Sequence, residues 1–157
     1  MFKNIDLTDS GVNVEESAVI ALEQLLKFRL PDDYRQFLLD ANGGRPEPNA
    51  FPLQDNPNDT FGLIERFFSL GNDDSDHDLI DNLAVFQNRV PSDLLPIAFD
   101  PGGNIICLGV SGEKKGGIYF WDHNDESMPG EEPDYHNIYF IAPSFDEFIL
   151  NLTTLPQ

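Results

Sequence analysis

Residues 94–123, LLPIAFDPGGNIICLGVSGEKKGGIYFWDH, carry the strongest structural signal in this chain. They predict three β-strands, over Leu94–Phe99, Asn104–Val110 and Gly117–Asp122. The first turn contains Pro101, which fixes φ, and two glycines, which accept the positive φ that follows. The second connection is a polar, glycine-bounded loop over residues 111–116, of a length that closes a wider hairpin. Connections this short require antiparallel pairing, so we expect a meander.

Both faces of the predicted meander are apolar. In its third strand Ile118 and Phe120 alternate with Tyr119 and Trp121, so large side chains point to either side. A sheet that is apolar on both faces has to be covered on both sides. We therefore expect the rest of the chain to supply layers above and below it.

The remaining segments predict helices and further strands. Helical spacing of apolar residues predicts four helices, over Val14–Phe28, from Pro31 to Ala41, over residues 76–89 and from Ser144 onward. Alternation of apolar and polar residues predicts two further strands, over Phe61–Leu70 and Ile138–Ala142. The helix over 76–89 should bury Leu79, Ile80, Leu83 and Phe86. Residues 45–60 carry four prolines and predict an ordered loop with one short extended piece around Phe51–Leu53. The expected fold is an α+β single domain over residues 1–157, with one antiparallel meander sheet flanked by helices.

The charge of the chain excludes several classes of partner. Its 157 residues include 28 Asp and Glu against 9 Lys and Arg, a formal net charge of −19 at pH 7. Nucleic acids and anionic membranes are bound through clustered Lys and Arg, so neither is an expected partner. A strongly acidic protein is instead attracted to a basic protein, and long-range attraction speeds that encounter.

The sequence also indicates a compartment. Residues 1–16 lack an apolar segment of signal-peptide length, and no run approaches the roughly 20 apolar residues of a membrane span. The single cysteine, Cys107, lies within an apolar strand and cannot form an internal disulfide, so we expect a buried, inert thiol. We expect a cytoplasmic protein.

The acidic residues gather in two segments that contain no Lys or Arg. The first acidic segment, residues 71–81, contains Asp73, Asp74, Asp76, Asp78 and Asp81. The second acidic segment, residues 122–134, contains Asp122, Asp125, Glu126, Glu131, Glu132 and Asp134. If the two segments lie close together, they create one negative field suited to a basic partner. The alternative is two solvated loops with no binding role.

Catalytic and metal-binding motifs receive little support from the sequence. An EF-hand needs Gly at the sixth position of its loop and Glu at the twelfth, and the first acidic segment has neither in any register beginning at Asn72 or Asp74. The three histidines show no zinc-type spacing. Asp122, His123 and Asp125 form an alternative hypothesis, a hydrolase or metal-dependent enzyme, but no G-x-S-x-G nucleophile motif accompanies them. We expect no catalytic residue, metal or cofactor.

Three stretches together resemble one family. They are LPDDYRQFLLDANGG at residues 30–44, LLPIAFDPGGNIICLGV at 94–110 and GGIYFWDH at 116–123, with FGL at 61–63 between the first two. In this order they resemble the SUKH superfamily of Smi/Knr-like domains. The resemblance implies an α+β fold with helices around an antiparallel sheet. It also implies a non-enzymatic role, either as a bacterial immunity protein that neutralises a cognate toxin, often a nuclease, or as a regulatory scaffold in cell-wall or stress signalling.

The combined hypothesis is an acidic face that binds a basic toxin stoichiometrically, in an oligomeric state that is left open. The residues expected to contact the partner are Asp73, Asp74, Asp76, Asp78, Trp121, Asp122, His123, Asp125, Glu126, Glu131 and Glu132. Trp121 is included because a partly exposed Trp beside carboxylates is a favourable binding anchor. This hypothesis requires the carboxylates to spread over an open face, whereas the enzyme alternative requires them to converge in one deep pocket.

Overall fold

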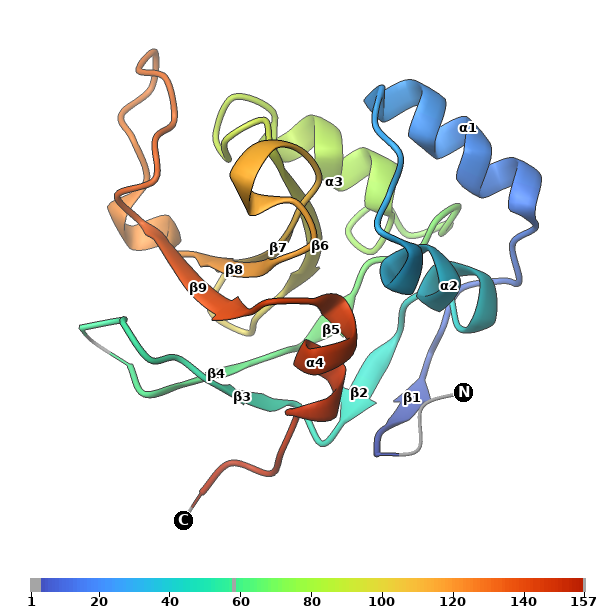
Figure 1. Ribbon diagram of the computed structural model, residues 1–157, viewed down its shortest axis with the longest axis horizontal. Helices are drawn as coiled ribbons and strands as arrows, with labels where there is room; N and C mark the ends of the chain where they lie inside the picture. Colours follow the sequence, from blue (N-terminus) through green and yellow to red (C-terminus); the bar gives the residue numbers. More distant parts are fainter. Residues whose placement is uncertain (1–3, 58, 157) are drawn as a thin grey trace.

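The computed structural model describes residues 4–57 and 59–156, and its centre is a five-stranded antiparallel sheet (Figure 1). The strands follow the order β5-β6-β7-β8-β9. Their bounds are β5 Arg66–Phe67, β6 Leu94–Phe99, β7 Ile105–Gly109, β8 Ile118–Trp121 and β9 Ile138–Ala142. The predicted meander over residues 94–123 is therefore confirmed, with Ile138–Ala142 as its next strand. The β6–β7 and β7–β8 connections are short, as antiparallel neighbours permit, whereas the β5–β6 connection contains α3 (Leu79–Phe86) and the β8–β9 connection contains the second acidic segment.

The expectation of a single sheet is wrong. Two additional two-stranded antiparallel sheets are present in the described residues, β1 (Asp6–Thr8) with β2 (Arg45–Glu47), and β3 (Ala50–Pro52) with β4 (Phe61–Leu63). The α+β class is nevertheless correct. The proline-rich residues 45–60 provide two of these short strands, β3 where the short extended piece was expected and β2 where only a loop was expected.

The predicted strand over Phe61–Leu70 is interrupted. Ile64 donates its backbone N–H to Asn49 at 2.9 Å, whereas the next residue, Glu65, donates to Phe99 of β6 at 2.8 Å. The chain thus leaves one sheet and joins another within two residues. Alternation also fails here, because Ile64 and every residue from Arg66 to Leu70 are buried. Buried Arg66 is accommodated by donating to the backbone oxygen of Asp9 at 2.9 Å.

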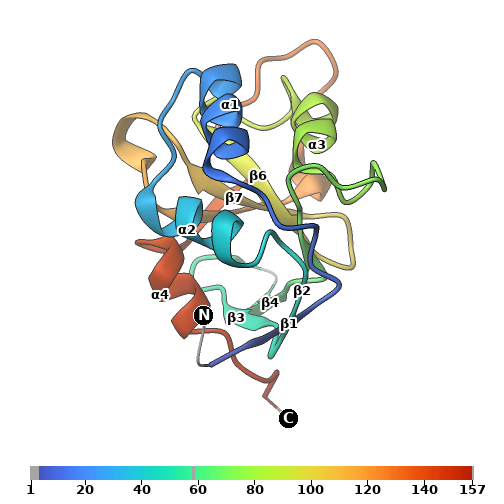
Figure 2. The same cartoon turned by 90° about the vertical axis from the view of Figure 1, so that its right-hand side faces the viewer.

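Helices cover both faces of the central sheet, as its two apolar faces require (Figure 2). On one face lie α2 (Asp32–Asp40), α4 (Phe145–Leu150) and the β3–β4 hairpin, in contact through an aromatic cluster that includes Phe37, Phe145 and Phe148. On the other face α3 (Leu79–Phe86) packs on β6, and Phe86 meets Trp121 edge to face at 5.7 Å between centroids. Cys107 is fully buried, which raises the pKa of its thiol, as expected of an inert cysteine.

The helix predicted over 76–89 is shorter in the structure, where α3 spans Leu79–Phe86. The prediction that Ile80 is a core residue is wrong. The side chain of Asp78 caps the helix by accepting from the Asp81 N–H at 3.0 Å, and the residue after the C-cap, Asn88, is left-handed. Asn82 faces inward and donates to the backbone oxygen of Asp78 at 2.8 Å. This turns Ile80 outward, where 39% of it is exposed.

Candidate functional site

The two acidic segments lie at opposite ends of α3. The first acidic segment leads into the start of the helix, where Asp78 is the N-cap. The second is attached near the other end, because Arg89, three residues beyond α3, binds Glu126 of this segment. Figure 1 shows the same separation, with the green loop before α3 and the orange loop between β8 and β9 on different sides of the molecule. The carboxylates therefore do not form one compact cluster.

Three of the predicted contact residues are buried, which corrects the sequence prediction for them. Asp78 is 7% exposed, Trp121 1% and Asp122 5%. The Asp78 carboxylate is bonded to the backbone N–H groups of Asn72 and Asp81, and that of Asp122 to the N–H of Asn124 at 2.9 Å. Trp121 packs in the core. The two carboxylates are buried because they satisfy backbone N–H groups of the adjoining turns, as buried polar groups must. All three side chains therefore stabilise the fold and present little surface to a partner.

The other predicted contact residues are exposed or partly exposed: Asp73, Asp74, Asp76, His123, Asp125, Glu126, Glu131 and Glu132. In the first acidic segment, successive side chains accept backbone N–H groups two residues on, as when Asn72 binds Asp74 at 2.9 Å and Asp74 binds Asp76 at 3.0 Å. Such Asx turns order a loop locally. The carboxylates of this segment are therefore presented from a defined backbone.

An ion pair fastens the second acidic segment to the turn that follows α3. Arg89 donates to both carboxylate oxygens of Glu126, from Nε at 2.8 Å and from Nη2 at 3.1 Å. The Arg89 guanidinium also lies over the rings of Phe86 and Trp121, at 4.8 and 5.8 Å from the centroids. The hydrogen bonds to Glu126 raise the pKa of Arg89. A bidentate pair of this kind fixes both partners geometrically.

His136 fastens the other end of the same loop. One ring nitrogen, Nδ1, faces the Asp134 carboxylate, and the other, Nε2, lies 2.5 Å from the backbone oxygen of Asp125. Both neighbours are acceptors, so the ring satisfies both only when both nitrogens carry protons. The hydrogen bond with Asp134 is the main reason why the pKa of His136 is raised, and it also lowers the pKa of Asp134.

We expect the pKa of His136 in the native protein to lie above the ordinary histidine value of 6.5. Since the native state binds this proton more tightly than the unfolded state, the resulting stabilisation is fully present below pH 6.5 and disappears as the pH rises through the higher native pKa. An NMR titration of the ring protons measures this midpoint. Asp134→Asn should lower it, because the hydrogen bond to a charged carboxylate is lost. An unchanged midpoint in that variant would contradict the assignment.

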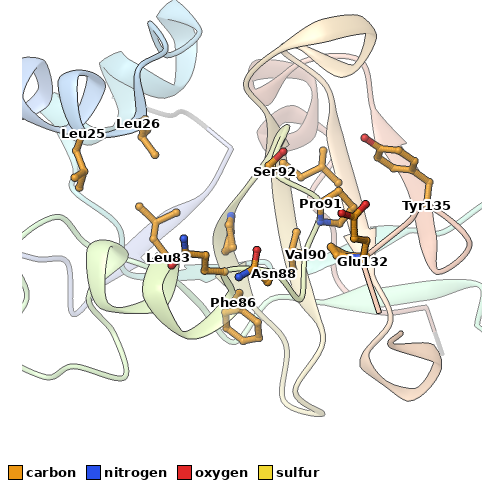
Figure 3. Close-up of a pocket in the computed structure, with 14 residues that line it drawn as sticks. Leu25, Leu26, Leu83, Phe86, Asn88, Val90, Pro91, Ser92, Glu132 and Tyr135 are labelled. Carbon is orange, nitrogen blue, oxygen red and sulfur yellow. The ribbon is translucent and has the colours of Figure 1, made fainter. Parts of the chain in front are cut away.

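A pocket of about 550 Å³ lies between the second acidic segment and the ends of α1 (Glu16–Leu26) and α3 (Figure 3). Leu25 and Leu26 of α1 face Leu83 of α3 across it. Its opposite wall is formed by Glu132 and Tyr135. The pocket thus has a mixed lining of apolar and polar side chains with a carboxylate among them, which can hold an apolar group beside a positive charge.

Tyr135 is held in position at the rim of this pocket. Its hydroxyl donates to the Asp93 carboxylate at 2.8 Å, and burial together with this contact raises the pKa of Tyr135. The Lys114 ammonium lies over the Tyr119 and Tyr135 rings, at 4.7 and 5.0 Å from their centroids. This cation is therefore engaged by two aromatic faces.

The side chains of Asp122 and His123, which belong to the enzyme alternative, make separate turn contacts. The Asp122 carboxylate caps the turn that follows β8, whereas the backbone N–H of His123 donates to the Asn104 side chain at 3.0 Å and its Nδ1 lies 2.5 Å from the same oxygen. His123 thereby ties this turn to the β6–β7 turn, and Asp125 is exposed. Among residues 4–57 and 59–156, no group of three or more His, Cys, Asp or Glu side chains is arranged to hold a metal ion.

Sequence reasoning missed the apolar half of the site. Leu25 and Leu26 belong to the apolar pattern that predicts the helix over Val14–Phe28, and no binding role was expected of them. In the structure Leu25 is 60% exposed and Leu26 is only partly buried. The sequence did contain one signal for this. The apolar residues of α1 occupy a wider part of the helix surface than the single stripe that packs on the core, so some of them have to be exposed.

The fold and the site define a small α+β protein with two exposed acidic segments and an open pocket between α1 and the second of them. The chain belongs to the SMI1/KNR4 family (SUKH-1), which it matches over residues 13–151. It is also similar to the SPbeta prophage-derived uncharacterized protein YokK of Bacillus subtilis (strain 168). The two are 31% identical over 150 residues, covering 86% of this chain and 72% of YokK. In the described part of the chain, no helix has both the length and the apolar character that crossing a membrane requires.

Proposed function

We propose that this protein is an immunity-type binding domain that neutralises a cognate toxin by stoichiometric binding. Membership of the SMI1/KNR4 family supports the type of protein, and the similarity to a prophage-derived protein is compatible with it. The observation that carries the proposal is an exposed acidic loop, fastened at both ends, beside an open pocket of mixed polarity. The proposed mechanism is occlusion of the toxin in the cytoplasm, with no chemical step performed by this chain.

The second acidic segment carries carboxylates that are not neutralised by ion pairs and could therefore attract a basic toxin. Glu126 is paired with Arg89, and Asp134 with His136. Asp125, Glu131 and Glu132 form no ion pair with any of the described residues. Free carboxylates on a fixed loop attract a basic surface without first having to break existing contacts.

Binding through such a surface follows from general electrostatics. Complementary fields raise association rates by about 10- to 1,000-fold, and the effect falls steeply with ionic strength. The order supplied by Arg89 and His136 lowers the entropy lost when the partner docks. A basic nucleic-acid-binding face is the kind of toxin surface that would be occluded in this way.

The direct test is co-expression with the adjacent large open reading frame, scored for rescue of growth. A toxic neighbour that becomes harmless in the presence of this chain, and that forms a one-to-one complex with it, is the expected result. Growth arrest that persists despite normal expression of both proteins would contradict the proposed function.

Neutralising two loop carboxylates should slow association with the toxin. We expect Glu131→Gln/Glu132→Gln to lower the association rate several-fold at low salt, with a smaller difference at high salt, because exposed charges are screened within about 10 Å at 0.1 M. Stopped-flow fluorescence at several salt concentrations measures this. The matched control is Asp55→Asn/Asp59→Asn, which removes two exposed charges from the distant β3–β4 connection. Equal slowing by both pairs would show that net charge alone matters.

A further inference from the structure

Helices α1 and α3 lie side by side on the same face of the sheet, as both views show (Figures 1 and 2). Each turns apolar side chains toward the other. Two pockets lie between the helices, and we name the surface that contains both the α1–α3 groove. Its helical side chains are Ala18, Ala21, Leu22, Leu25 and Leu26 of α1 and Ile80, Leu83 and Phe86 of α3.

The α1–α3 groove has a pocket at each end. The one near the helix C-termini is the pocket of about 550 Å³ in Figure 3. The other, of about 470 Å³, lies near the start of α3, where Ile80 faces Ala18, Ala21 and Leu22. Leu25 and Ile80 remain 60% and 39% exposed. Open pockets of this size, one mainly apolar and the other mixed, can each accept a bulky side chain.

An acidic segment lies beside each pocket. Glu132 lines the first pocket, and Glu131 adjoins it in the chain. Asp78, whose carboxylate is bonded to backbone N–H groups, lines the second pocket, and the carboxylates that a partner could reach near it are those of the exposed Asp73, Asp74 and Asp76. The nearby cations Arg89 and Lys114 are already engaged, by Glu126 and by two tyrosine rings. Apolar side chains of both helices therefore line the two pockets, and acidic residues adjoin each of them.

We propose that the α1–α3 groove binds one amphipathic segment of the toxin, with apolar side chains in the two pockets and Lys or Arg at both ends. The proposal rests on the proposed function and names the chemistry of the partner. It explains why the acidic segments are separated, since each meets one end of the same bound segment. Apolar anchors flanked by complementary charge are a recurrent mode of peptide recognition.

A synthetic amphipathic peptide of leucine and lysine tests the groove without the toxin. The probe is added to the isotope-labelled full chain, and amide shifts are followed by NMR. We expect the perturbed amides to lie in residues 18–26 and 80–86 and in the two acidic segments. A peptide with serine in place of leucine keeps the charge and should leave the helix amides unchanged. Identical perturbation by the two peptides, or none on α1 and α3, would overturn the proposal.

A matched pair of variants separates the groove from the rest of the helical surface. Leu25→Ser/Ile80→Ser changes one exposed residue of each helix inside the groove. Ile20→Ser/Val85→Ser changes one exposed residue of each helix that lines neither pocket. We expect the first pair to weaken peptide and toxin binding about tenfold, and the second pair to leave both unchanged.

The growth assay distinguishes the two proposals. A toxin that the natural chain fails to neutralise contradicts the proposed function, whatever the peptide does. Full affinity of Leu25→Ser/Ile80→Ser for toxin and peptide contradicts the groove and leaves the immunity role standing. Circular dichroism of both double variants should match the natural chain, because the substituted side chains are exposed.

Discussion

Gly109→Ala is expected to destabilise the native state by about 3 kcal/mol, as overpacking at a site that cannot relax does. A Cβ at this position would lie 1.8 Å from the backbone oxygen of Lys114 and 2.4 Å from its carbonyl carbon. Both are main-chain atoms, so no side-chain rotation relieves the clash. The loop over residues 111–116 would have to move away from the end of β7.

That movement would break the hydrogen bonds that close the hairpin between β7 and β8. Gly109 donates to Gly117 at 2.8 Å and accepts from Gly116 at 2.8 Å, and Lys114 accepts from Gly117 at 3.0 Å. Urea denaturation followed by circular dichroism measures the free energy of unfolding. The control is Gly102→Ala in the neighbouring turn, where the nearest atom to a new Cβ is 3.6 Å away. A loss of less than 1 kcal/mol in Gly109→Ala would show that the loop adapts.

Phe145→Ala is expected to lower the free energy of unfolding by about 3 to 5 kcal/mol. Phe145 is fully buried at the start of α4. Its ring lies 5.3 Å from Tyr34, 4.9 Å from Phe37 and 5.9 Å from Phe67 between centroids. Truncation removes the contacts through which α4 packs on α2 and β5 and leaves a cavity in the core.

Leu150→Ala provides the matched control for this prediction. Leu150 ends the same helix but is 67% exposed, so its truncation should change stability by no more than about 0.5 kcal/mol. Thermal unfolding followed by circular dichroism compares the two variants. Equal melting temperatures for Phe145→Ala and Leu150→Ala would contradict the proposed role of the aromatic cluster.

The meander and the terminal helix were predictable because their signals are local. Alternating apolar residues, the Asp100–Gly103 turn and the glycine-bounded loop act between chain neighbours, so the observed strands agree with the prediction within one residue at each end. The same holds for α4, where Ser144 caps the helix by accepting from Glu147 at 3.1 Å. The surplus of negative charge and the acidic segments were also legible in the sequence alone.

Long-range packing decided the features that the sequence did not reveal. Which aspartate caps α3, and which way Ile80 points, depends on Asn82 turning inward to bind backbone oxygens. The strands of the β1–β2 and β3–β4 pairs have three residues each, which is too short for an alternating apolar pattern to be recognised in the sequence. The α1–α3 groove exists because both helices pack on one face of the sheet although more than 50 residues separate them in the chain. Periodicity shows that a side chain is apolar, but only the packed structure shows whether another element covers it.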